Sequence, residues 1–136
     1  MTLRTVVQQW VQGTLGCHCE AAVFDRIEVS RGMSGLVEPR LELVIGQRLL
    51  VQVRVVDATE SLAVLLPRWL AEGVQRRDAR QLNRLRLVLC GDVASLSERV
   101  QALLEQLPLP DERIHVHVLP LATLLALESA IAPGGV

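Results

Sequence analysis

Two cysteines on alternate residues flank a histidine near the start of this chain, in the tripeptide Cys17-His18-Cys19. In an extended segment both thiols project to the same side, where they can share one soft metal ion or form one disulfide. The disulfide would close a small strained ring, and strained disulfides tend to be labile and regulatory. We therefore predict a redox pair or a metal half-site at Cys17 and Cys19, with Zn, an Fe-S cluster or Cu as the cofactor. Burial of two small side chains is the alternative.

A complete zinc site needs four ligands, and the remaining soft ligands in the chain are Cys90, His115 and His117. We expect Cys90 at the far end of the fourth strand, at the opposite edge of the sheet from the cysteine pair. We expect His115 and His117 on one face of the fifth strand, several strand spacings of about 4.8 Å from the first strand. The prediction is that the pair does not form a whole metal site within one chain.

Composition predicts one globular unit without a membrane segment. The chain has 136 residues, half of which are apolar, which is enough to fill one core. We expect one domain over residues 1–136 with a frayed tail at 133–136. No charge-free run approaches the length that crosses a bilayer. Three cysteines, an odd number, argue against a disulfide framework, so we expect a cytoplasmic protein.

All cationic side chains are arginines, and five of them gather in the middle of the chain. Aromatic residues that could stack on bases do not interleave with them. We predict a solvated face and no nucleic-acid partner. The five are Arg76, Arg77, Arg80, Arg84 and Arg86.

Hydrophobic periodicity predicts the element order α-β-β-β-α-β-α-β-α. The fold class is α/β with α+β character, built as a two-layer or three-layer sandwich around a five-stranded mixed sheet. Strands one to three form an antiparallel meander, and the fourth and fifth add in parallel by right-handed crossovers. Thr2 should cap the first helix and Gly13 end it, Pro67 should kink or break the second, and Ser95 with Glu98 should open the third. The expected strands are 22–29, 41–45, 49–56, 85–90 and 113–119, and three of the expected helices are 2–13, 95–107 and 121–132. The second helix is expected to start at Thr59 or Ser61 and to bear Leu62, Leu65, Leu66, Trp69 and Leu70.

The last of these helices is apolar nearly all round. A helix of this kind is usually covered on every side. We predict that it mediates homodimerisation or contact with a protein partner, which makes a noncatalytic interaction module the alternative function. Its apolar residues are Leu121, Leu124, Leu125, Leu127 and Ile131.

The order helix, three strands, helix, strand is similar to the core of the PD-(D/E)xK nucleases. In that family an acidic residue near the second strand and an E-x-K motif on the third bind Mg²⁺. The matching stretch here contains Glu38 or Glu42 and then Gln52-Val53-Arg54. Gln52 lacks the carboxylate and Arg54 the lysine amine, so Mg²⁺ binding is weakened. The resemblance, which rests on topology over about two-thirds of the chain, implies a degenerate, noncatalytic relative. No complete catalytic motif is present, and whether the chain is an enzyme stays open.

Overall fold

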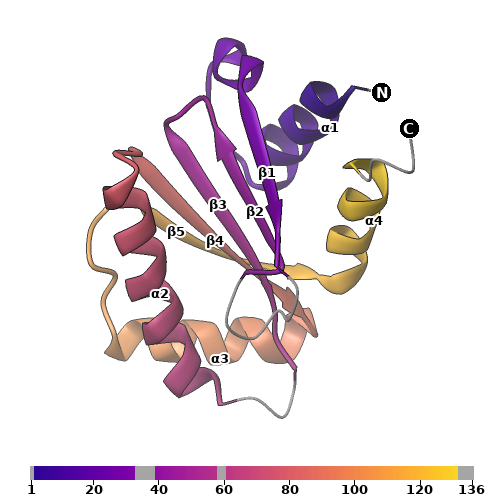
Figure 1. Cartoon of the computed structure of the whole chain (residues 1–136). Helices are drawn as coiled ribbons and strands as arrows, with labels where there is room; N and C mark the ends of the chain where they lie inside the picture. Colours follow the sequence, from indigo (N-terminus) through magenta and orange to yellow (C-terminus); the bar gives the residue numbers. More distant parts are fainter. Residues whose placement is uncertain (1, 33–38, 58–60, 132–136) are drawn as a thin grey trace.

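The structure is a computed structural model that describes residues 2–32, 39–57 and 61–131. Five strands form one sheet in the order β1-β2-β3-β4-β5. The first two pairings are antiparallel and the last two are parallel, as the sequence predicts (Figure 1). The strands are β1 (Ile27–Arg31), β2 (Leu41–Ile45), β3 (Leu49–Val55), β4 (Arg84–Gly91) and β5 (Ile114–Pro120).

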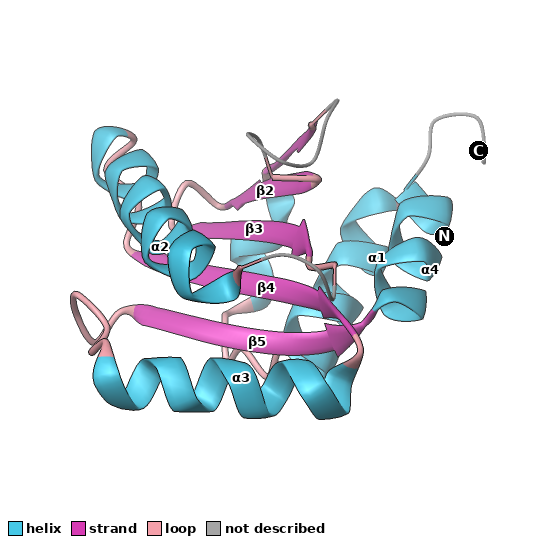
Figure 2. Cartoon of the chain, turned by 90° about the horizontal axis from the view of Figure 1, so that it is seen from below, coloured by secondary structure: helices cyan, strands magenta, loops and turns pink. Residues whose placement is uncertain are grey.

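Helices cover both faces of the sheet, so the sandwich has three layers. Figure 2 shows α2 and α3 along one side of the strands and α1 beside α4 at the other. The helices are α1 (Leu3–Gln9), α2 (Leu62–Ala79), α3 (Val93–Gln106) and α4 (Leu121–Ile131). Among the described residues, no helix combines the length and apolar character that crossing a bilayer requires.

Each face of the sheet carries its own apolar core, because side chains of a strand alternate between the two faces. Val51 and Val53 of β3 pack toward α1 and α4, with Phe24 and Leu124. Leu50 of the same strand packs in the core under α2 and α3. The central strands are thus buried on both faces, as expected where helices cover both sides.

The β2–β3 hairpin matches its predicted place, and its turn uses left-handed backbone. Gly46 has φ +61° and Gln47 has φ 54°. A side-chain carbon added at Gly46 would lie 2.7 Å from the carbonyl oxygen of Val23. Glycine is therefore required at this position for its backbone angle and for space.

The N-terminal segment differs from its prediction in two places. Thr2 caps α1 as expected, accepting a hydrogen bond from the N–H of Thr5. The chain then continues as a π-helical turn over Trp10–Thr14, so Gly13 does not end the helix. The expected strand at 22–29 is largely a 3₁₀ turn, Ala21–Asp25, and β1 begins only at Ile27. Both irregular turns arise because burial of Trp10, Val11 and Phe24 against the sheet outweighs local propensity.

Two helix predictions also differ from the structure. α2 runs unbroken through Pro67, so the helix does not break there, and Leu66, Trp69 and Leu70 are buried around the proline. Packing of these side chains compensates for the one backbone hydrogen bond that a proline removes. α3 begins at Val93 after Asp92, two residues before the expected start, so Ser95 and Glu98 lie inside the helix.

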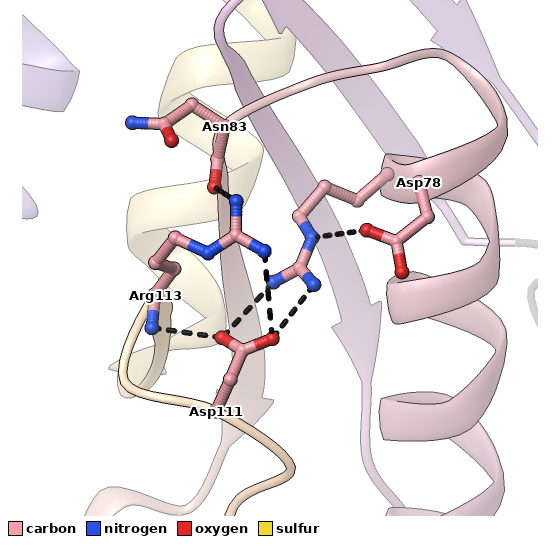
Figure 3. Close-up of polar contacts among 5 residues, drawn as sticks. Asp78, Asn83, Asp111 and Arg113 are labelled. Atoms are coloured by element: carbon pink, nitrogen blue, oxygen red, sulfur yellow. Dashed lines mark hydrogen bonds and ion pairs between the residues drawn. The ribbon is translucent and has the colours of Figure 1, made fainter.

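The arginine cluster is not the solvated face that we expected. Arg77 is 1% exposed and donates two hydrogen bonds to Asp111, at 2.7 and 3.2 Å, and one to Asp78 at 3.0 Å. Asp111 also accepts from the N–H of Arg113, whose side chain donates to the carbonyl of Asn83 (Figure 3). The network ties the end of α2 to the loop that leads into β5. Arg76 and Arg80 pair with glutamates, and Arg86 is buried.

Candidate functional site

The turn that carries the two cysteines is held by hydrogen bonds at both of its ends. Gly16 adopts φ +70°, and the N–H of Cys17 donates back to the carbonyl of Val11 at 3.1 Å. This left-handed residue closes the helix end, as glycine commonly does. The Gln12 side chain donates to the Cys19 carbonyl at 2.9 Å, and Arg86 donates to the Leu15 carbonyl at 3.0 Å. These hydrogen bonds therefore fix the position of the turn that bears the two thiols.

Cys17 and Cys19 are joined by a disulfide, and their Cα atoms are 5.4 Å apart. Cys17 is 8% exposed and belongs to the core under α1 and α4. Cys19 is half-buried, and His18 between them is exposed. The sulfur of Cys19 is thus the one that an external reagent reaches more readily.

The cysteine turn forms one wall of a pocket of about 620 Å³. The pocket lies at the edge where β3, β4 and β5 begin, which is where the sequence placed the cysteine pair. His115 and His117 line the same pocket, contrary to the expectation that they lie far from it. The strand order is as predicted, but residues 15–20 lie beside the start of β4, where Arg86 donates to the Leu15 carbonyl, and they share the pocket with the histidines of β5. The thiol, charged and imidazole groups in its lining include Cys17, Cys19, Glu20, Arg48, Arg84, Arg86, His115 and His117.

Arg86 links the cysteine turn to the histidines. Its Nη1 lies 2.9 Å from Nε2 of His117 as well as 3.0 Å from the Leu15 carbonyl oxygen. Burial, with a smaller contribution from the positive charge of Arg86, lowers the pKa of His117 to about 4. His117 is thus neutral at physiological pH, and its Nε2 accepts the hydrogen bond from Arg86.

Buried polar atoms without partners accompany this link. Within the described residues, Nε of Arg86 and Nδ1 of His115 have no hydrogen-bond partner. Burial also lowers the pKa of Arg86 and, aided by Arg86 and Arg84, that of His115. A buried polar atom without a partner is costly, and such atoms are often found where a ligand or water binds.

The charge of the pocket lining is positive. Arg48, Arg84 and Arg86 face a single carboxylate, that of Glu20. Arg48 and Arg84 are exposed, and no ion pair within the described part of the chain involves either of them. Positive charge near a sulfur favours its thiolate form, which is the nucleophile in thiol chemistry.

Cys90 takes no part in the pocket. It is a free, buried cysteine near the end of β4, paired in register with Val55 and Leu119. Burial raises the pKa of its thiol to about 11. Four residues of extended chain, about 13 Å, separate it from Arg86. This placement agrees with the prediction that Cys90 lies at the other edge of the sheet.

No protein-family model, curated protein or solved structure matches this chain. Gln12 and Arg86 are the two positioning residues that the sequence reasoning missed. Arg86 had a detectable signal, since it is the one charge inside the apolar run 85–90 and shares its strand face with no other polar residue of that run.

The residues that resemble the PD-(D/E)xK pattern lie on the other face of the sheet. Glu42 of β2 accepts a hydrogen bond from Gln52 of β3 at 3.0 Å and pairs with Arg76 at 2.9 Å. Arg54 pairs with Glu72 at 3.3 Å and lies over the ring of Trp69. Glu38, the other proposed acidic residue, lies outside the described residues. The one described carboxylate is thus engaged by an arginine and an amide.

Metal-ligand geometry is not found in the described part of the chain. No group of three or more His, Cys, Asp or Glu side chains there is arranged to hold a metal ion. Among the residues that the structure describes, the carboxylate of Glu42 does not make a magnesium site, and Cys17 and Cys19 are not part of a group of three or more potential ligands. A metal bound at Cys17 and Cys19 would need the reduced thiols and ligands from elsewhere.

Within the described part of the chain, the C-terminal helix is buried on one side. Leu124 and Leu127 of α4 are buried against α1 and the sheet, whereas Leu121 is 38% and Leu125 47% exposed. That a second copy of the chain or a protein partner covers these two leucines stays a prediction.

Proposed function

We propose that this protein carries out thiol–disulfide exchange through Cys17 and Cys19 in a reducing, cytoplasmic environment. The observation that carries the proposal is a disulfide between cysteines only two residues apart in the sequence. The turn that holds it is hydrogen-bonded and lines a pocket with excess positive charge. In such a compartment a disulfide forms transiently in redox work.

The short ring argues against a structural role for this bond. A disulfide stabilises a fold mainly by restricting the unfolded chain, and the effect grows with the length of the closed loop. Cys17 and Cys19 are two positions apart, so the disulfide closes a loop of only three residues and restricts the unfolded chain very little. The bond is thus better suited to opening and closing than to holding the fold together.

The exchange proceeds in two balanced steps. An external thiolate attacks the sulfur of half-buried Cys19, the bond to Cys17 breaks, and the Cys17 thiolate leaves and takes a proton. A second external thiolate then attacks the reagent sulfur of the mixed disulfide, releasing a small disulfide and the Cys19 thiolate, which is protonated in turn. The sum is one protein disulfide and two thiols giving one protein dithiol and one small disulfide. In reverse, the dithiol reduces a disulfide.

Equilibration with dithiol redox buffers, followed by alkylation and mass spectrometry, tests the proposal. We expect a reduction potential between about −180 and −270 mV, the range of redox-active pairs. In Cys17→Ser treated with the disulfide of a small monothiol, a mixed disulfide should accumulate at Cys19 because Cys17 is no longer there to resolve it. Cys90→Ala is the matched control and should behave as the wild-type protein. A potential below about −300 mV would overturn the proposal.

Elemental analysis of anaerobically purified protein separates the metal-binding version of this function from the redox version. The redox version predicts no stoichiometric Zn, Fe or Cu. Stoichiometric metal that Cys17→Ser and Cys19→Ser both remove would contradict it, and would mean that another chain supplies the missing ligands.

A second candidate function is supported by the exposed leucines of α4. Leu121 and Leu125 lie one turn apart, where a second copy of the chain can cover them and make a homodimer. The protein would then be a noncatalytic interaction module. In keeping with this, the Glu42 carboxylate is bound by Gln52 and Arg76, and Gln52 and Arg54 stand where the nuclease motif has glutamate and lysine.

Solution mass tests this candidate. A dimer is expected for the wild-type chain, and Leu125→Glu should give a monomer because it places a charge in the contact. Val64→Glu, at a 66% exposed position on α2, is the matched control and should leave the dimer intact. A monomeric wild-type protein rules the dimer out.

A further inference from the structure

The arginines that line the same pocket as the disulfide favour the binding of a negative charge. Arg48 lies in the β2–β3 turn, and Arg84 and Arg86 are the first and third residues of β4. The three come together because β3 and β4 are parallel and begin at the same edge, with Leu49 paired to Arg84. Glu20 is the one carboxylate among the lining residues, so the arginines exceed the acidic groups by two.

The arginines differ in how far they are committed to other partners. Arg86 is 8% exposed, and its Nη1 donates to the Leu15 carbonyl and to Nε2 of His117. Its Nε has no hydrogen-bond partner among the described residues. Arg48 and Arg84 are exposed and form no ion pair within the described part of the chain. Most other arginines do have acidic partners, among them Arg4, Arg40, Arg54, Arg68, Arg76, Arg77 and Arg80.

We propose that this pocket selects small thiols and disulfides that carry a carboxylate, which Arg48, Arg84 and Arg86 bind while the sulfur meets Cys19. The inference rests on the proposed exchange function and names its substrate class. Arginine donates to carboxylates through paired N–H groups, which gives both attraction and orientation. A volume of about 620 Å³ admits a molecule of this size together with water.

The geometry also explains how one site serves both steps. A carboxylate held by the arginines keeps the reagent sulfur beside the half-buried Cys19. The same positive charges favour the thiolate that leaves Cys17, because an opposite charge lowers the free energy of the ionised form. Neutral His115 and His117 add hydrogen-bonding groups without adding a competing charge.

Rates of disulfide reduction by three small thiols test the inference. Mercaptoacetate, mercaptoethanol and cysteamine are similar in size and carry a negative, zero and positive charge. Each rate is divided by the thiolate concentration and compared with the rate for the oxidised tripeptide Cys-His-Cys with blocked ends. We expect the protein to favour mercaptoacetate over mercaptoethanol by at least about threefold more than the peptide does, and to lose this preference at high salt.

Substitutions assign the preference to the arginines. Arg84→Gln and Arg48→Gln should each reduce it, and Arg84→Lys should retain most of it because the charge is kept. Arg68→Gln removes the same charge from an exposed side chain of α2, on the other face of the sheet, and should leave the preference unchanged.

The two proposals fail separately in this experiment. A charge preference equal to that of the peptide, or one that persists in both arginine variants, overturns the inference about the substrate. Reduction potentials below about −300 mV overturn the exchange function itself, whichever thiol reacts faster.

Discussion

Buried Arg86 and half-buried His117 form a pair in which the arginine keeps its charge and the histidine is neutral. Burial and the neighbouring arginine both oppose a proton on the ring, which holds the His117 pKa at about 4. Loss of Arg86 would leave the Leu15 carbonyl and His117 Nε2 without their donor. The pair therefore connects the protonation of one ring to the position of the cysteine turn.

Stability should depend on pH through His117. The unfolded chain binds a proton on this ring near pH 6.5, whereas the folded chain does so only near pH 4. The stabilisation is fully present above pH 6.5 and is lost as the pH falls toward 4. The His117→Gln variant keeps an acceptor for Arg86, but its glutamine does not titrate. Between pH 6.5 and pH 4 its free energy of unfolding should therefore fall less than that of the wild-type protein. Urea unfolding over this pH range measures the difference, and identical pH profiles would contradict it.

Cys90 should be inert in the folded protein. Burial raises the pKa of its thiol to about 11, so almost no thiolate exists at neutral pH. Titration of the reduced native protein with a disulfide reagent should count two rapidly reacting thiols, and a third only in denaturant. Cys90→Ala should show the same two rapid thiols and no third. Rapid reaction of a third thiol in the native wild-type protein would refute the assignment.

At the level of the elements, regular periodicity could be read from the sequence and irregular turns could not. The alternation in 41–45 and 49–55 predicted the hairpin, and its register follows from the buried faces. The π turn at Trp10–Thr14 and the 3₁₀ turn at Ala21–Asp25 have no such period. Their shape is set by packing on a sheet whose later strands lie far along the chain. The path of residues 15–20, which lie between these two turns, could not be predicted, and neither could the pocket that the cysteines share with His115 and His117.

The β2–β3 turn offers a matched pair of substitutions. Gly46→Ala should destabilise the fold by more than about 1 kcal/mol, because the position has positive φ and the added carbon meets the backbone of Val23. Gln47 also has positive φ and bears an exposed side chain, so Gln47→Gly should be neutral or stabilising by up to about 1 kcal/mol. Thermal unfolding of both variants measures the contrast. Equal effects would mean that the turn relaxes easily.

At the scale of the whole molecule, the ion pair of Arg77 and Asp111 connects α2 to the loop between α3 and β5. The hydrogen bond from Arg77 lowers the pKa of Asp111, so this contribution is complete above the usual carboxyl pKa and is lost in acid. Asp111→Asn should lower the free energy of unfolding by about 2 kcal/mol, since Arg77 is left buried with Asp78 alone. Asp25→Asn, which breaks the exposed pair with Arg4, should change it by less than about 0.5 kcal/mol. Urea denaturation compares them, and similar losses would mean that the buried pair contributes nothing special.

Reduction of the disulfide should affect global stability only weakly. For a loop of three residues, the chain-entropy model predicts that reduction of the disulfide lowers the free energy of unfolding by about 1.6 kcal/mol. Urea unfolding of the oxidised and reduced protein measures the loss, with Cys17→Ala/Cys19→Ala as a control that should not respond to reductant. A loss of several kcal/mol would show that the bond holds the fold together.

The histidines of the pocket come from β5, the last strand of the sheet, and the cysteines come from the first twenty residues. During synthesis the thiols leave the ribosome well before β5 does, and the parallel crossovers that place β4 and β5 beside β3 join distant segments, which fold slowly. A nascent chain thus meets cellular oxidants with its dithiol exposed and without the arginine-lined wall. Selectivity among thiols belongs only to a chain in which β4 has joined β3, and a chain truncated before residue 84, which lacks Arg84 and Arg86, should react with thiols of any charge.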